Sequence, residues 1–428
     1  MASAIILGFL FLLLALGVPV GFSMGVAGAV GVITIGGVDM LAGVLQTSPL
    51  SSVSGYELVT IPMFLLMAEF VTGSGIADDL FRAAAAWTGH IRGGLGMATA
   101  ITGAGFGAMC GTSTAAAAAL SSTSLPAMLK QGYDPKVAGG VVAISGTLSM
   151  LIPPAVALVI FGLLAQVNIG KLLVGGLVPA FLVMLTIMAT VYLIGVFDPK
   201  SAPAGARVAF RERVRTVVAV WPMLLLMVLV SGVIYTGVAT LTEASAIGAF
   251  GAFLISVWKR GFDPRLIRQA AIKASISACM ISTIILGAQV FGYFFALTHV
   301  TQDLVAWVAA LNTSRWVIVI FILLMYIVLG AFMDQIAILV LTVPVVIPVI
   351  VSLGFDPIWF GVIKIVTAEV GMVTPPVGLN CFIVARYAQR PVSEVFRGIV
   401  PHFAAHILII GVFLAFPQLI LWLPSLIN

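Results

Sequence analysis

Two consecutive prolines, Pro375 and Pro376, interrupt an apolar run that is long enough to cross a membrane. The run reads T-A-E-V-G-M-V-T-P-P-V-G-L-N-C-F over residues 367–382. Proline removes a backbone donor and clashes with the preceding turn, so a helix must break here. In lipid a broken helix is tolerated only where the break is buried in protein or lines a cavity. The segment therefore predicts a discontinuous helix at membrane depth, inside a larger helical assembly.

The composition supports a membrane protein with many spans. Hydrophobic residues make up 61% of the chain and charged residues 8%, against roughly 25% charged in a soluble domain. The apolar runs are long and broken by Gly and Pro, without period-two alternation, so we expect an all-α polytopic protein and exclude a porin-like barrel. The segment from Ala4 to Val20 lacks a basic start and a cleavage site, and is expected to be a retained anchor. Cys110, Cys279 and Cys381 lie far apart and are expected to be small core residues.

Hydropathic runs place the expected spans, and two runs do not fit a single crossing. The runs near 93–122 and 315–350 are each too long for one span and have a polar, Gly-containing centre. We predict that each is a re-entrant helical hairpin, which enters the membrane, turns at a tip and leaves on the same side. Full crossings are predicted near 4–22, 56–74, 137–168, 172–196, 217–236, 243–258, 276–297, 357–390 and 400–425.

The distribution of basic residues predicts the orientation. With the N-terminus in the cytoplasm, 17 of the 20 Lys and Arg residues fall in cytoplasmic loops, which leaves only Lys171, Arg315 and the intramembrane Lys364. The C-terminus is then expected to be periplasmic. The net charge of +5 is scattered between spans and does not indicate nucleic-acid binding. The segment 201–216 is basic and is predicted to be a cytoplasmic linker between a first half, 1–200, and a second half, 217–428.

The two halves are related by an internal repeat. L-P-A-M-L-K-Q-G-Y-D-P at 125–135 aligns with I-P-V-I-V-S-L-G-F-D-P at 347–357, and without a gap M-L-I-P-P at 150–154 falls on M-V-T-P-P at 372–376. An odd number of crossings separates the two proline pairs, so the repeats point in opposite directions. Inverted-topology repeats with discontinuous helices are typical of secondary transporters.

Each half therefore offers a hairpin tip and a helix break that can bind ligands. The carbonyl ends of half-helices suit a small cation such as Na⁺, and their amide ends suit the carboxylate of an anion. Small residues at the tips let backbone oxygens approach an ion. Close helix packing is the better explanation for any one of them taken alone, but the repeated pairing of a hairpin tip with a helix break favours ligand binding for the set. Charges inside the membrane are rare and costly. Of the four candidates, Asp334 is expected to be functional, Lys364 and Glu369 are expected to pair, and Glu69 is the fourth.

Three segments resemble one known family. G-M-V-T-P-P-V-G-L-N at 371–380, C-G-T-S-T-A-A-A-A-A at 110–119 and I-P-M-F-L-L-M-A-E-F at 61–70 closely resemble the large membrane subunit of the tripartite ATP-independent periplasmic (TRAP) transporters, and the similarity covers essentially the whole chain. The resemblance implies an elevator-type importer of the bacterial inner membrane. Its cargo would be an organic anion, such as a C4-dicarboxylate or sialic acid, coupled to Na⁺. A periplasmic binding protein would deliver the cargo, and a separate small four-helix membrane subunit would accompany the chain.

The resemblance also implies sodium ligands at Ser149, Ile152 and Pro154 in the first half and at Gly330, Gly371 and Thr374 in the second. This chain departs from the family pattern at Cys110, where serine is common, and at Ser149, where glycine is common. Together with the tip residues, the expected first sodium site comprises Gly107, Cys110, Gly111, Thr112, Ser113, Ser149, Ile152 and Pro154. The expected second sodium site comprises Gly330, Asp334, Gly371, Thr374 and Val377. The expected substrate contacts are Ser113, Thr114, Pro375 and Asn380.

Other classes fit the sequence less well. An ion channel also uses re-entrant loops with exposed carbonyls, and it is the main alternative. An intramembrane enzyme would need a catalytic constellation that the sequence lacks, and an ATP-driven pump would need a phosphate-binding loop. His402 and His406 share a helix face without a third ligand, which favours an interfacial helix over a metal site.

Overall fold

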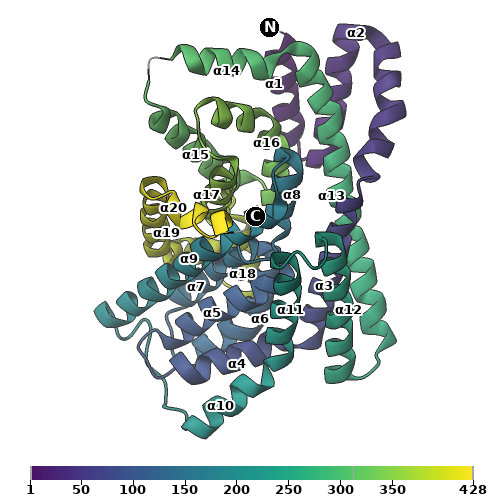
Figure 1. Cartoon of the computed structure of the whole chain (residues 1–428). Coiled ribbons are helices and arrows are strands. Elements are labelled where there is room, and N and C mark those ends of the chain that lie inside the picture. The colour runs from purple at the N-terminus through teal and green to yellow at the C-terminus, as the bar shows by residue number, and fades with distance from the viewer. Residues whose placement is uncertain (1, 312, 427–428) are drawn as a thin grey trace.

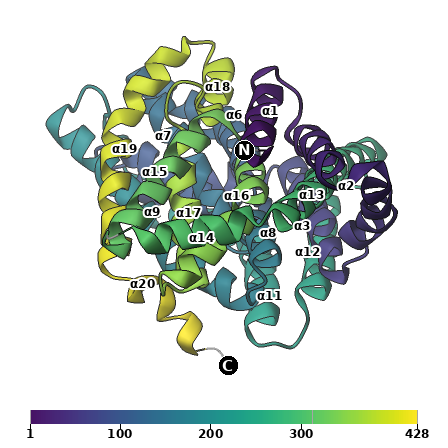
Figure 2. The same cartoon turned by 90° about the horizontal axis from the view of Figure 1, so that it is seen from above.

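The computed structural model describes residues 2–311 and 313–426, and the described parts contain helices and no strands. Two groups of helices lie side by side (Figures 1 and 2). We call α1–α3 and α11–α13 the scaffold, and α5–α9 with α15–α19 the hairpin body. Eight of the described helices are long and apolar enough to cross a membrane, or nine if one bent pair is a single span. The chain is therefore a multi-pass membrane protein.

The scaffold is built from long helices that pack in pairs. Its members are α1 (Ala2–Ala15), α2 (Val20–Val53), α3 (Thr60–Ser74, preceded by the 3₁₀ turn Tyr56–Val59), α11 (Trp221–Tyr235), α12 (Leu241–Arg260) and α13 (Pro264–Thr298). Helix α2 packs against α13, and α3 packs against α12. Thr60 and Thr242 share a hydrogen bond of 3.0 Å between their hydroxyls. The two pairs are the counterparts of each other in the two repeats.

Glycines in the first part of α2 allow a very close approach to α13. A Cβ on Gly21 would lie 2.8 Å from the carbonyl oxygen of Thr283, and one on Gly28 would lie 2.7 Å from the Cα of Phe291. Residue numbers at these contacts increase together along both helices, so this part of α2 runs parallel to α13. Small residues permit such backbone contact between membrane helices. At Gly37, φ of 76° and ψ of −175° break α2 into two segments.

The predicted first crossing at 4–22 is wrong, and the sequence analysis missed α2. Helix α1 ends at Ala15, the chain turns at Gly17 with φ of 81°, and α2 returns. Leu7 of α1 lines the same groove as Val300 and Leu304 of α14 (Val300–Ala310), which follows the far end of α13. The start of α1 therefore lies at the opposite end of the scaffold from the basic junction of α12 and α13 (Figure 1).

The hairpin body contains the two predicted hairpins. The first is α5 (Gly94–Cys110) with α6 (Ser113–Lys130), and the second is α15 (Arg315–Phe332) with α16 (Gln335–Ser352). Their turns define a first tip, 110–113, and a second tip, 332–335. Gly111 at the first turn has φ of 64°, a left-handed conformation that favours glycine.

Both proline pairs interrupt helices, as the sequence predicts. Helix α7 (Pro135–Thr147) continues through the 3₁₀ turn Leu148–Met150, and α8 (Val156–Ala165) begins after a first break, 151–155. In the second repeat α17 (Pro357–Gly371) and α18 (Leu379–Ala388) flank a second break, 372–378. Helix α18 packs against α6, and α16 packs against α8, so each half-helix contacts the hairpin of the other repeat.

The remaining helices join and cover these bodies. Helix α9 (Ile169–Phe197) is the predicted span near 172–196, and α19 (Val392–Ala415) starts before the predicted span near 400–425. A chain segment from 198 to 209 connects the halves, where a linker at 201–216 was predicted. The second part of the predicted linker is helical and belongs to α10 (Phe210–Ala219), which bends by 49° into α11. The other elements are α4 (Ile76–Thr88), α20 (Gln418–Leu421) and the 3₁₀ turn Pro424–Leu426.

Candidate functional site

The first tip lies against the first break. A Cβ added to Gly107 would lie 2.5 Å from the Cα of Ser149, and one on Gly111 would lie 3.2 Å from the carbonyl oxygen of Pro154. Glycine is therefore required where the hairpin backbone touches the break. The structure brings these four residues of the expected first sodium site together. Ile152, in the same break, is only partly buried.

The second tip meets the second break in the same way. A Cβ on Gly330 would lie 2.5 Å from the carbonyl oxygen of Ala368, and one on Gly371 would lie 2.7 Å from the Cα of Gly330. The backbone amide of Gly378 donates a hydrogen bond of 3.2 Å to the carbonyl oxygen of Ala331. Gly330 and Gly371, two expected ligands of the second site, are thus in direct contact.

A cavity of about 290 Å³ lies where both tips face the scaffold. From the hairpin body it is lined by Cys110, Thr112, Thr114 and Asp334, all of which the sequence analysis selected. Met150, just before the first break, and Met372, the first residue of the second break, also line it. The scaffold supplies the other wall through α3 and α13. The further lining residues are Leu65, Ala68, Glu69, Thr72, Ala115, Ala274, Ser277, Met280, Ile281, Ile336 and Leu379.

The scaffold side of the cavity is what the sequence analysis missed. Ser277 and Met280 of α13 give no motif, because their role depends on which helix packs across from the tips. Glu69 was noted only as an intramembrane charge, and its carboxylate lies 3.8 Å from the ammonium group of Lys273. The rarity of a carboxylate within a membrane helix was the one available signal.

Asp334 has a structural role in addition to its place in the cavity. One carboxylate oxygen accepts hydrogen bonds from the backbone amides of Ile336 at 2.8 Å and Ala337 at 3.1 Å. Asp334 is thus the N-cap of α16, and its negative charge meets the positive end of the helix dipole. This contact fixes the turn of the second tip and compensates part of the charge that faces the cavity.

Two expected site hydroxyls donate to carbonyls of their own helical segments. Thr374 donates a hydrogen bond of 2.6 Å to the carbonyl oxygen of Val370, and Ser149 donates one of 2.8 Å to that of Gly146. Because the hydroxyl proton is engaged, each oxygen presents its remaining lone pairs. Such oxygens, like the free carbonyls of a broken helix, suit a cation rather than an anion.

Ser113 and Asn380 meet across the two repeats. The hydroxyl of Ser113, at the first tip, donates a hydrogen bond of 3.5 Å to the amide oxygen of Asn380, at the start of α18. Both residues are fully buried, and the amide nitrogen of Asn380 has no hydrogen-bond partner in the described part of the chain. Neither lines the 290 Å³ cavity, and Pro375 and Val377 are exposed outside it. Of the four expected substrate contacts, the cavity therefore includes Thr114 alone.

The predicted pairing of Lys364 with Glu369 is wrong. Both side chains are buried, and neither has a hydrogen-bonding partner within the described chain. A separation of five residues turns them about 140° apart around the helix, so they cannot face each other. The ammonium group of Lys364 instead lies 4.8 Å from the centre of the Tyr326 ring.

The two histidines are also placed differently from the prediction. His402 and His406 are buried residues of α19 instead of lying at an interface. A ring nitrogen of His406 hydrogen-bonds the carbonyl oxygen of His402 at 2.8 Å. The described residues contain no group of three or more His, Cys, Asp or Glu side chains that could hold a metal ion.

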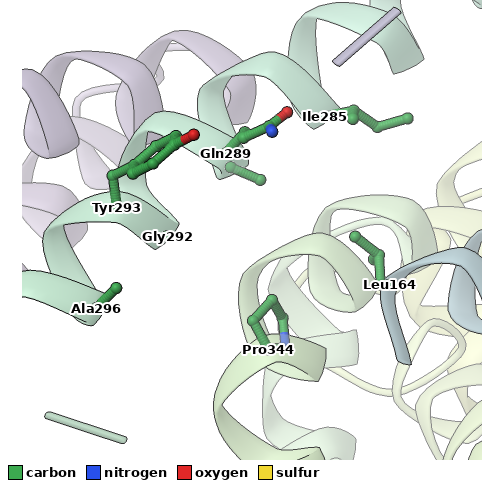
Figure 3. Close-up of a pocket in the computed structure, with 8 residues that line it drawn as sticks. Leu164, Ile285, Gln289, Gly292, Tyr293, Ala296 and Pro344 are labelled. Carbon is green, nitrogen blue, oxygen red and sulfur yellow. The ribbon is translucent and has the colours of Figure 1, made fainter. Parts of the chain in front are cut away.

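A second crevice continues along α13. Figure 3 shows Ile285, Gln289 and Tyr293 of α13 on one side, and Leu164 of α8 with Pro344 of α16 on the other. Its volume is about 360 Å³. Together with the 290 Å³ cavity, it shows that the boundary between the scaffold and the hairpin body is incompletely packed over much of α13.

Known proteins match the chain over nearly its whole length. The family model described as the DctM component of the tripartite ATP-independent periplasmic transporters matches residues 7–419. A C4-dicarboxylate TRAP transporter large permease protein from Pseudomonas aeruginosa is 33% identical over 372 residues, which cover 86% of each chain. A sialic acid large permease protein from Vibrio cholerae is 29% identical over 98% of each chain. An ectoine/5-hydroxyectoine large permease protein from Ruegeria pomeroyi is 29% identical over 100% of this chain and 99% of that relative.

The fold is also similar to that of a solved transporter structure. The Alcanivorax borkumensis YdaH transporter superposes with a TM-score of 0.68, covering 98% of this chain and 99% of that one, at 16% sequence identity. At this identity the likeness concerns the arrangement of helices alone.

Proposed function

Because the chain belongs to the DctM family of large TRAP transporter subunits, we propose that it imports an organic anion coupled to Na⁺ by an elevator movement. Its relatives are transporter permeases and not enzymes. The cargo we propose is a carboxylate, of the class to which C4-dicarboxylates and sialic acid belong. A periplasmic binding protein would deliver it, and a small four-helix membrane subunit would complete the complex.

One observation carries this proposal. The 290 Å³ cavity is bounded on one side by both tips and on the other by scaffold helices α3 and α13. A ligand held there contacts both bodies, so sliding of the hairpin body along the scaffold would carry the ligand across the membrane. The incomplete packing along α13 supports a boundary that moves.

The tip and break pairs are the proposed sodium sites. Helix ends and unwound backbone present carbonyl oxygens without intrahelical partners, and such carbonyls coordinate Na⁺ in secondary transporters. The first site would use the contact of Gly107 and Gly111 with the first break, and the second would use the contact of Gly330 with Gly371. Thr374 would add a hydroxyl or carbonyl oxygen at the second site.

The basic end of the scaffold gives the proposed orientation in a bacterial inner membrane. The α12–α13 junction carries Lys259, Arg260, Arg265 and Arg268, which favours the cytoplasm for this end. The start of α1 lies at the other end, so the N-terminus is proposed to face the periplasm. This differs from the orientation that the sequence predicts, because that prediction counted 4–22 as one crossing.

The test is transport by the chain reconstituted with its two partner subunits in liposomes. With an inward Na⁺ gradient, we expect uptake of the carboxylate that the purified binding protein retains. Replacing Na⁺ with K⁺ on both sides should abolish accumulation. Equal uptake driven by a K⁺ gradient without sodium would exclude the coupling, and ion currents far above transporter turnover would support a channel instead.

A further inference from the structure

Gln335 is a buried amide without hydrogen-bond partners among the residues that the structure describes. It is the first residue of α16, at the second tip, and its side chain is 0% exposed. Neither its amide oxygen nor its amide nitrogen has a hydrogen-bond partner in the described chain. Burying an unsatisfied amide opposes folding, so a group of this kind indicates an occupant other than the protein's own side chains.

The side chain of Gln335 is directed away from the substrate cavity. Its neighbours Asp334 and Ile336 both line the 290 Å³ cavity, whereas Gln335 does not. It therefore points into the hairpin body, where packing leaves no exposed surface. An organic anion does not fit on that side, and an occupant must be as small as a single ion or water.

The internal repeat indicates which part of the hairpin body Gln335 faces. In the register that aligns the two proline pairs, Gln335 falls on Ser113, and both are the first residue of the second helix of a hairpin. Ser113 reaches the opposite repeat, where its hydroxyl contacts the Asn380 amide oxygen at 3.5 Å and the Met372 sulfur at 3.8 Å.

The counterparts of those two partners lie at the first break. Met372 corresponds to Met150 and Asn380 corresponds to Leu158. Helix α16 packs against α8, and Met150 lines the same cavity as the two neighbours of Gln335. The repeat therefore directs Gln335 toward the first break and the start of α8, where Leu158 stands in place of an amide and provides no hydrogen bond.

We propose that the Gln335 amide oxygen is a ligand of the sodium ion at the first site, supplied from the opposite repeat. This inference rests on the proposed Na⁺ coupling. Small hard cations take oxygen ligands, including side-chain amides and backbone carbonyls. The ion would then link the second hairpin to the first break, as the Ser113 to Asn380 hydrogen bond links the first hairpin to the second break.

The experiment measures thermal unfolding of the purified full chain against NaCl, with choline chloride keeping ionic strength constant. Gln335→Met preserves length and removes both polar atoms. We expect it to need at least about tenfold more Na⁺ for half-maximal stabilisation. Without Na⁺ it should unfold at the same temperature as the wild type or higher, because an unpaired buried amide has been removed. Gln389→Met, at an exposed position, is the control and should leave the Na⁺ midpoint unchanged.

A second variant keeps the test decisive if Gln335→Met fails to fold. Gln335→Glu retains an oxygen ligand, and at pH 8 we expect a Na⁺ midpoint at or below that of the wild type. A wild-type midpoint in Gln335→Met, or a midpoint raised about tenfold in Gln335→Glu, would overturn the assignment and leave Gln335 as a packing or water-binding residue. If Na⁺ does not change the unfolding temperature of the wild-type protein, the proposed Na⁺ coupling is excluded, and this assignment with it.

Discussion

The two breaks share one sequence device but have different surroundings. In the first, Leu151, Pro153 and Ala155 are buried, and only Ile152 is partly exposed. In the second, Pro375, Pro376 and Val377 are all exposed, with Val377 at 38%. A proline pair fixes where a helix ends but not what covers the gap. The difference teaches that the matched halves are not equivalent in this conformation, since one break is closed and the other is open.

The half-helices before the breaks also differ in charge. Helix α17 carries Lys364 and Glu369, both buried, where the repeat register places Val142 and Thr147 in α7. Buried ions without a paired partner cost free energy and are usually retained for function or specificity. The open break is therefore attached to a half-helix with two buried ionisable groups that lack partners among the described residues. The closed break is attached to α7, whose one ionisable side chain, Lys136, is exposed.

The largest expected effect tests what the two halves have in common. Gly371→Ala would place a Cβ 2.4 Å from the carbonyl oxygen of Ile327, and Gly107→Ala would place one 2.5 Å from the Cα of Ser149. Both clashes involve backbone, so each variant should lose at least about 3 kcal/mol of stability and all uptake in liposomes.

Gly411→Ala is the matched control, because nothing lies within 4 Å of its added Cβ in α19. It should keep wild-type uptake and unfolding temperature. Full uptake by Gly107→Ala would show that the first hairpin is not held against its break. The two halves would then not share this contact.

The second prediction tests the difference in exposure. In a chain whose native cysteines are replaced by alanine, Val377→Cys should react with a small maleimide at least about tenfold faster than Ala155→Cys, since only the first is exposed. The two positions correspond in the repeat. Denatured protein is the control, where both cysteines should react at the same rate. Equal rates in the folded protein would mean that the first break opens as readily as the second.

The smallest effect concerns the buried charge of α17. Lys364→Met should raise the free energy of unfolding by about 1–2 kcal/mol, because an apolar side chain of similar length replaces a buried amino group whose contact is the Tyr326 ring and which has no hydrogen-bond partner among the described residues. Lys130→Met, at an exposed position, should change it by less than about 0.5 kcal/mol. Thermal unfolding measures both. Destabilisation by Lys364→Met would show that the packing of α17 against the Tyr326 ring needs the amino group.

Local backbone chemistry made the hairpins and breaks predictable. The turn at Gly111 needs a left-handed residue, Asp334 caps the helix that follows it, and the proline pairs end helices wherever they occur. Helix α2 was missed because its many glycines, considered from the sequence alone, indicate a break in the helix. They are tolerated because their missing side chains let the backbone of α13 approach.

The sequence by itself determined that this chain crosses a membrane, carries two inverted halves and breaks two helices at matched positions, because these features depend on hydropathy and on residues with restricted or unusual backbone geometry. Only the tertiary structure decided that Ser113 meets Asn380, that Gln335 is buried with no partner among the described residues, that Lys364 lies on an aromatic ring and that α3 and α13 close the cavity. Each of these depends on the packing of segments far apart in the chain, which no local pattern encodes.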